Sequence, residues 1–119
     1  MRMRPVARQR QNLLGILRSV QGPTGARPHC IACRIYEEDG PDAAVLYVEH
    51  WTSDDEFEDH VRSNVYHRIL AALELSRAEP EVRFDFVSRT AGLELLEKLR
   101  TAPSRGQGLA ELTSDVKSR

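Results

Sequence analysis

Hydrophobic residues recur along this chain with two different periods, and the change from one period to the other predicts the order of its elements. Residues 29–38 and 43–51 follow a period of two, which predicts two strands. Residues 6–21 follow helical spacing, and Gly22-Pro23-Thr24-Gly25 is expected to end this helix. Residues 1–5 can form a short strand that Pro5 ends. The helical apolar positions are Val6, Leu13, Leu14, Leu17 and Val20.

The two predicted strands are joined by Asp39-Gly40-Pro41-Asp42, which is typical of a tight turn. We therefore expect them to pair as an antiparallel hairpin. Alternation places Val45, Tyr47, Glu49 and Trp51 on one face of the second strand, and His50 on the other. Both faces are largely apolar, so both should be covered.

A second helix is predicted directly after Trp51. Ser53-Asp54-Asp55-Glu56 forms a capping box, in which the serine hydroxyl accepts a backbone N–H and Glu56 reaches back. The helix should bend near Ser63-Asn64 and end at Glu79-Pro80.

The remaining part of the chain predicts one more strand and one more helix. Residues 81–88 alternate like a strand, and Gly92 to Arg100 have leucines at amphipathic spacing. We expect a flexible C-terminal tail over 101–119, within which residues 109–116 could form a short helix.

This order predicts an α+β fold, namely a ferredoxin-like βαββαβ arrangement with an antiparallel four-stranded sheet and an extra C-terminal helix. The domain would span residues 1–100, with the tail at 101–119. Two helices cover one face of such a sheet, so its other apolar face needs a second subunit. We therefore expect a homodimer that stacks sheet on sheet.

Composition narrows the possible partners. The 119 residues include 29% charged side chains and carry a net charge of −1, so no excess charge favours nucleic acid or a membrane surface. No apolar run approaches the ~18 residues of a membrane-spanning helix. We expect a soluble, cytoplasmic protein.

Cys30 and Cys33 form a Cys-x-x-Cys motif, but its context favours a strand over the helix N-terminus that redox chemistry uses. The two sulfur atoms would then point to opposite faces. No second ligand pair has the spacing of a zinc site. We interpret both cysteines as small buried strand residues rather than as a redox pair.

The segment Tyr47-Val48-Glu49-His50-Trp51-Thr52-Ser53, followed by Phe57, His60 and Val65-Tyr66, resembles the antibiotic biosynthesis monooxygenase domain. The likeness covers residues 1 to about 90. It implies a dimeric α/β barrel similar to small quinol monooxygenases and anthrone-oxidising enzymes. Pro28-His29-Cys30 resembles the Pro-Gly-Cys of that family, but His29 replaces the glycine, so a tight glycine turn is not expected there.

The resemblance implies cofactor-independent oxygenation of a small aromatic phenol, quinol or anthrone by O2. Of the residues implied to be catalytic, His60 would accept the proton, Trp51 would form a wall of the pocket, and Glu49 or Arg34 would orient the oxyanion. The residues implied to bind substrate are Tyr47, Phe57, Arg34 and Tyr66. A dry pocket with a base would suffice for this chemistry.

Several alternatives stand beside this interpretation. His60 could be structural, bonded to Glu49 or to a backbone carbonyl, and the same barrel also serves as a non-catalytic ligand-binding or stress-responsive dimer. A metal site is not expected, because His60 and His67 would lie about 10 Å apart along a helix. Haem degradation is disfavoured, since haem-degrading relatives have tryptophan at the position of His60 and histidine at that of Leu70, and their first-strand asparagine has no counterpart in Met1 to Arg4.

Overall fold

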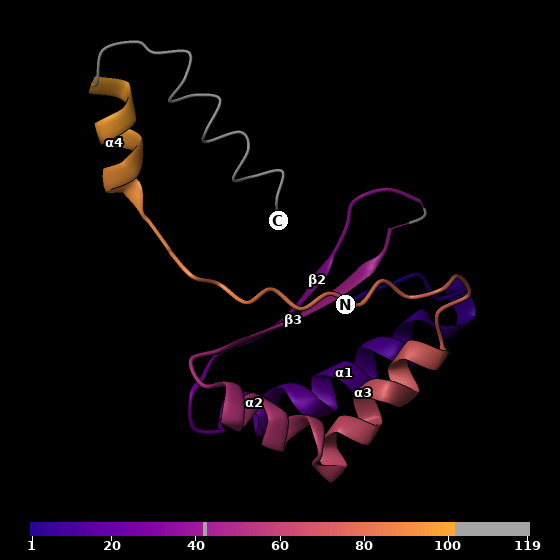
Figure 1. Ribbon diagram of the computed structural model, residues 1–119. Helices are drawn as coiled ribbons and strands as arrows, with labels where there is room; N and C mark the ends of the chain where they lie inside the picture. Colours follow the sequence, from indigo (N-terminus) through magenta and orange to yellow (C-terminus); the bar gives the residue numbers. More distant parts are fainter. Residues whose placement is uncertain (42, 102–119) are drawn as a thin grey trace. The chain divides into compact units, whose positions relative to one another are not determined.

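The computed structural model describes residues 1–41 and 43–101, which belong to two compact units. The first unit spans Met1–Arg83 and holds the sheet and the helices that cover it (Figure 1). The second begins at Phe84 and contains one described helix. Residues 109–116, where a short helix was predicted, lie outside the described part of the chain.

The described sheet has three antiparallel strands, β1 (Arg2–Met3), β2 (Cys30–Glu37) and β3 (Val45–Trp51), in the order β1-β3-β2. The predicted hairpin is confirmed, and its register pairs Glu37 with Val45 and Cys33 with Glu49. An irregularity between Cys30 and Ala32 shifts the register near the end of β3. This register decides which side chains of β2 share a face with those of β3.

The turn before β2 keeps a glycine-like backbone although it carries a histidine. His29 has φ of 66°, in the left-handed region that favours glycine. Thr52 stabilises this unfavourable backbone conformation, because its backbone N–H donates to the His29 carbonyl over 2.9 Å and its hydroxyl lies 3.1 Å from His29 Nδ1. The expectation that the tight turn would be lost with the glycine was therefore wrong.

The first α-helix begins and ends later than predicted, at Arg10 and Gly25. A short 3₁₀ turn, η1 (Ala7–Gln9), leads into α1 (Arg10–Gly25), which runs through the segment expected to end it. Pro23 lies in the last turn, where its missing N–H leaves the Ser19 carbonyl without a helical donor. Arg68 Nη1 lies 3.5 Å from that oxygen, so a neighbouring helix supplies a donor to the carbonyl that the proline leaves open.

The second predicted helix forms as two, α2 (Asp54–Val61) and α3 (Asn64–Glu74). The serine half of the predicted capping box is confirmed, since the Ser53 hydroxyl accepts the Glu56 backbone N–H over 3.3 Å, whereas the Glu56 carboxylate lies 3.9 Å from Arg27. At the predicted bend the helix is interrupted rather than bent. Ser63 has extended backbone angles, and its hydroxyl donates to the His60 carbonyl over 2.7 Å. The break lets α2 and α3 approach the sheet at different angles (Figure 1).

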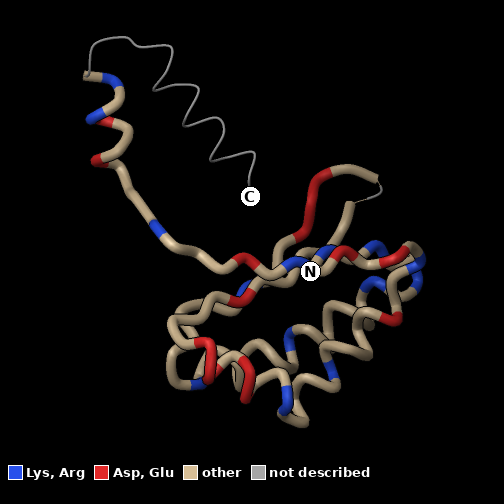
Figure 2. The backbone as a smooth tube through the Cα atoms, viewed as in Figure 1, with Lys and Arg blue, Asp and Glu red and all other residues tan. Residues whose placement is uncertain are grey.

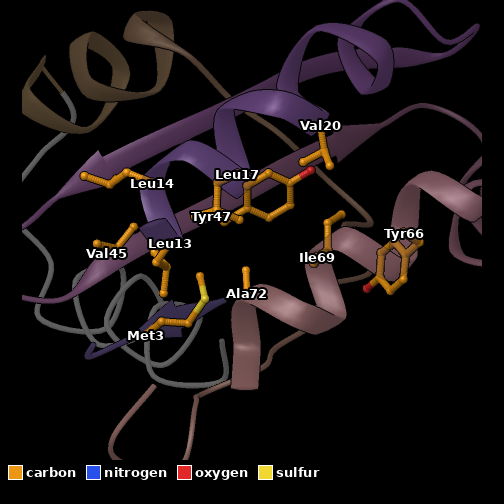
Figure 3. Packing of buried hydrophobic residues seen from close by; sticks show 10 residues of the cluster. All are labelled: Met3, Leu13, Leu14, Leu17, Val20, Val45, Tyr47, Tyr66, Ile69 and Ala72. Carbon is orange, nitrogen blue, oxygen red and sulfur yellow. The ribbon is translucent and has the colours of Figure 1, made fainter. Parts of the chain in front are cut away.

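Helices α1 and α3 lie side by side on one face of the sheet and enclose the core (Figures 1 and 3). Leucines of α1 face Val45 and Tyr47 of β3, and Ile69 of α3 closes the space between the helices. Fully burying such a side chain contributes roughly 1.5–3 kcal/mol to stability. The ten clustered residues are Met3, Leu13, Leu14, Leu17, Val20, Val45, Tyr47, Tyr66, Ile69 and Ala72.

The fourth predicted strand does not form among the described residues of this single chain. Only Glu81 pairs with Arg2 of β1, through backbone N–O distances of 2.8 and 3.0 Å. That position is where a fourth strand of the ferredoxin-like order would begin, but the strand stops after one residue. The alternating pattern is present, but the neighbouring strand β1 is only two residues long and offers a short edge for pairing. Its apolar residues Val82, Phe84, Phe86 and Val87 are exposed.

The last predicted helix is confirmed as α4 (Leu93–Thr101), with exposed Leu93, Leu96 and Leu99. Glu94 in its first turn accepts the Gly92 backbone N–H over 2.9 Å, and this bond lowers the pKa of that carboxyl.

Charges of both signs are distributed along the first unit (Figure 2). Arg2 joins two chain segments, because its guanidinium lies 2.8 Å from Glu38 and 3.4 Å from Glu81. Both pairs are solvent-exposed, so each contributes little to stability. None of the helices in the described ranges has the length and apolar character that a membrane crossing requires.

Candidate functional site

Glu49 is the centre of a polar cluster on the helix-covered face of the sheet. Its Oε1 accepts the indole N–H of Trp51 over 2.9 Å. Its Oε2 accepts the Tyr47 hydroxyl and lies 3.0 Å from His60 Nε2. The Glu49 side chain is about 9% exposed, so this carboxylate is nearly buried and depends on its partners for compensation of its charge.

Local sequence explains how these groups meet. Period-two alternation along β3 puts Tyr47, Glu49 and Trp51 on one face. The cap at Ser53 starts α2 three residues after Trp51, and Phe57 and His60 then fall on one side of that helix because they are three residues apart. The centroid of the Trp51 ring lies 6.3 Å from that of Phe57 and 5.1 Å from that of His60.

His60 is enclosed by aromatic rings and is 0% exposed. The Tyr66 ring meets it edge-on, with centroids 5.4 Å apart and planes at 90°. Within the described part of the chain, its buried Nδ1 atom has no hydrogen-bond partner, whereas Nε2 faces Glu49. One ring nitrogen is thus engaged and the other is available.

Cys33 extends the cluster from β2. Its thiol donates to the Tyr47 hydroxyl over 3.3 Å, and burial raises the pKa of Cys33 to about 11. Burial also raises the pKa of Cys30, whose sulfur lies 3.5 Å from the Ala32 carbonyl. Both cysteines are free thiols, but they are half-buried rather than fully buried. The expectation that they point to opposite faces was wrong, because the register shift between Cys30 and Ala32 pairs Cys30 with Trp51 and Cys33 with Glu49, on one face of β3.

Burial likewise keeps the two tyrosines neutral. The pKa of Tyr47 is strongly raised, first by burial and then by its hydrogen bonds to Cys33 and Glu49. The pKa of Tyr66 is raised by burial and by the nearby charge of Glu49. Tyr47 therefore remains a hydrogen-bond donor to the carboxylate through the ordinary pH range.

The structure brings six of the seven predicted site residues together: Tyr47, Glu49, Trp51, Phe57, His60 and Tyr66. It does not bring Arg34 to them. Arg34 is exposed and pairs with Val48, on the opposite face of the sheet from Glu49, so its assignment to this site was wrong.

Sequence reasoning also missed one residue of the cluster. Cys33 stands opposite Glu49 in the hairpin register, so the pairing of β2 with β3 would have revealed it. In the described ranges, no three His, Cys, Asp or Glu side chains gather in a way that could hold a metal ion.

The three-stranded sheet with helices on one face defines an α+β protein of ferredoxin-like architecture. A sequence profile of the antibiotic biosynthesis monooxygenase family matches residues 1–72, more than half of the chain. The chain therefore belongs to the antibiotic biosynthesis monooxygenase family, as the resemblance around Glu49 and Trp51 predicted.

Solved structures with the same fold include Rv0793 from Mycobacterium tuberculosis, with a TM-score of 0.59 and 24% identity over 73% of this chain and 93% of that one. A conserved protein from Methanosarcina mazei Go1 has a TM-score of 0.58 and 22% identity over 67% of this chain and 80% of that one. At these identities the likeness concerns the fold alone. A comparison with curated proteins gave no significant match.

Proposed function

We propose that this protein is a cofactor-independent monooxygenase that oxidises a small quinol-like or anthrone-like aromatic substrate with O2. The observation that carries the proposal is the buried pair of His60 and Glu49, joined over 3.0 Å and bordered by aromatic rings. Membership of a family that includes monooxygenases supports the same assignment.

The proposed chemistry uses His60 as the proton acceptor. Removing the acidic proton of an anthrone gives an anion that transfers one electron to O2, forming a carbon radical and superoxide. The two radicals couple to a peroxide, which takes a proton from His60 and then loses water to leave a new carbonyl. One oxygen atom enters the product and the other leaves as water.

The remaining cluster residues have supporting roles in this proposal. Glu49 orients the imidazole and stabilises it when it carries a proton. Trp51, Phe57 and Tyr66 supply an aromatic environment that excludes water from the radical pair. Because His60 is 0% exposed, substrate entry requires that at least one neighbouring side chain moves.

The open face of the sheet supports a homodimer. Leu46 and Val48 of β3 and Tyr36 of β2 lie on the face away from the helices, and Tyr36 is 50% exposed. Proteins of this family are generally small dimers. We place the second subunit on this face, where it would cover these side chains.

A non-catalytic ligand-binding dimer is the second candidate. It is favoured by the complete burial of His60, whose bond to Glu49 would then serve to hold α2 against the sheet. Under this alternative the aromatic cluster binds a small aromatic molecule without turning it over.

Oxygen uptake with a quinol or anthrone substrate tests the proposal. We expect His60→Gln to lower the rate by at least ~100-fold, the usual contribution of a general base, with the melting temperature within a few degrees of wild type. His67→Gln, at an exposed position of α3, is the matched control and should retain the wild-type rate. Wild-type uptake no faster than buffer, with unchanged ligand binding, would establish the second candidate instead.

A further inference from the structure

The candidate site leaves open which nitrogen of His60 accepts the proton, and the hydrogen bonds around Glu49 answer this. Three groups converge on the carboxylate: the Tyr47 hydroxyl and the Trp51 indole N–H donate to it, and His60 Nε2 lies 3.0 Å from Oε2. An ionised carboxylate can only accept, so all three bonds are satisfied together when Glu49 is charged and His60 Nε2 carries a hydrogen.

The opposite tautomer would break this arrangement. If Nε2 of His60 carried the lone pair, it would face the charged Oε2 of Glu49 at 3.0 Å with no proton between them. A proton on Glu49 would remove this conflict only at a cost, because Oε2 already accepts the Tyr47 hydroxyl and Oε1 already accepts the Trp51 indole N–H. The neutral imidazole is therefore fixed with its hydrogen on Nε2.

The tautomer fixes the reactive atom as well. With Nε2 committed to Glu49, the lone pair of His60 lies on Nδ1. This atom is buried and lacks a hydrogen-bond partner among the described residues. A buried acceptor without a donor is costly, so this site favours a ligand that presents a hydroxyl hydrogen.

We infer that His60 Nδ1 is the atom that accepts the substrate proton, and that Tyr47 and Trp51 are positioning residues that hold Glu49 ionised and so fix this tautomer. Tyr47 had been predicted to bind substrate, but its hydroxyl is occupied by Glu49 and Cys33, and its side chain is only 3% exposed. The inference rests on the proposed function for the identity of the ligand, but the assignment of the tautomer is independent of turnover.

Nitrogen-15 NMR of the imidazole tests the assignment directly on the full-length protein. We expect the neutral ring of His60 to carry its hydrogen on Nε2 with an excess of about tenfold or more, as one hydrogen bond to a charged acceptor produces. Glu49→Gln should abolish this preference, because a glutamine side chain can present either an oxygen or an NH2 group to the ring.

Tyr47→Phe distinguishes a positioning role from simple packing. It keeps the ring but removes the hydroxyl, so the Nε2-hydrogen excess of His60 should fall several-fold, whereas Tyr36→Phe on the exposed side of β2 should leave it unchanged. With a substrate that the protein oxidises, Tyr47→Phe should lower kcat about tenfold and change KM little.

Three results would overturn the inference: a wild-type His60 with its hydrogen mainly on Nδ1, a Tyr47→Phe variant with the wild-type tautomer ratio, or a Tyr47→Phe variant that changes KM alone. An Nε2-hydrogen tautomer in a protein that consumes no oxygen would support the positioning roles while rejecting the oxygenase. The two proposals can therefore fail separately.

Discussion

The indole of Trp51 and the imidazole of His60 lie 5.1 Å apart, centroid to centroid, with 34° between their planes. Trp51 is the single tryptophan of the chain, so the fluorescence of the protein reports on this contact. Since the imidazole packs against the indole, we expect His60→Gln to change the emission of Trp51, whereas a substitution away from this contact should not.

The measurement is the emission spectrum of the folded wild type and of two variants. His60→Gln should change the intensity or position of the Trp51 emission, while His67→Gln on the exposed side of α3 should leave it unchanged. Identical spectra of His60→Gln and wild type would show that the His60 ring does not contact the indole in solution.

Alkaline pH should destabilise the protein from about pH 10 upward. Burial raises the pKa of both Tyr47 and Tyr66, whereas an unfolded tyrosine ionises near pH 10. Above that pH the unfolded chain loses protons that the folded chain retains, so the free energy of unfolding falls as pH rises. Denaturant unfolding between pH 8 and 11 measures this slope, and Tyr47→Phe should make it shallower than Tyr36→Phe does.

Cys33 should react slowly with alkylating reagents. With a pKa of about 11, its thiolate fraction at pH 8 is about a hundredfold below that of a thiol with a pKa near 9. Mass spectrometry after timed iodoacetamide labelling, with a model thiol peptide as reference, gives the rate for each cysteine. Labelling of Cys33 as fast as the peptide would contradict its place in the buried cluster.

Ser53→Ala should lower the free energy of unfolding by about 1 kcal/mol, because it removes the acceptor for the Glu56 backbone N–H. Ser53→Asp supplies another cap oxygen at the start of α2 and should restore most of that stability. Urea unfolding monitored by circular dichroism compares the three proteins. Equal stability of Ser53→Ala and wild type would show that other contacts hold this end of α2.

Val48→Asp should weaken the proposed dimer by about a hundredfold, because it places an unpaired charge on the open face of the sheet. Gln11→Asp makes the same change of charge at an exposed position of α1, on the other side of the sheet, and should leave association unchanged. Sedimentation at graded concentrations measures both. A monomeric wild type at high concentration would reject the interface.

Much of the site was predictable because its residues are placed by the repeat of a single strand or a single helix. Alternation alone placed Glu49 and Trp51 on one face, and the cap at Ser53 placed His60 on the helix that follows. Arg34 and Cys33 were misjudged for one shared reason. Which face of β2 meets Glu49 depends on the register of the hairpin, and register arises from pairing between strands rather than from the pattern of either one.

The errors in the fold also lie where tertiary contacts override local signals. Pro23 was expected to end a helix, but near the last turn its cost is small, and Arg68 contacts the carbonyl that it leaves open. Residues 82–88 have the composition of a strand, but β1, the strand beside Glu81, is only two residues long. Helix α4 was predicted correctly because amphipathic spacing and a favourable first turn suffice for it.

The three groups that surround Glu49 also constrain how β3 can align during folding. A displacement of β3 by one residue would turn Tyr47, Glu49 and Trp51 outward together, and would bring Val48 and His50 beneath the helices in their place. Misaligned pairings would lose all of these hydrogen bonds at once, whereas apolar contacts could partly re-form. The same carboxylate that would assist a proton transfer therefore also selects a single alignment of the sheet.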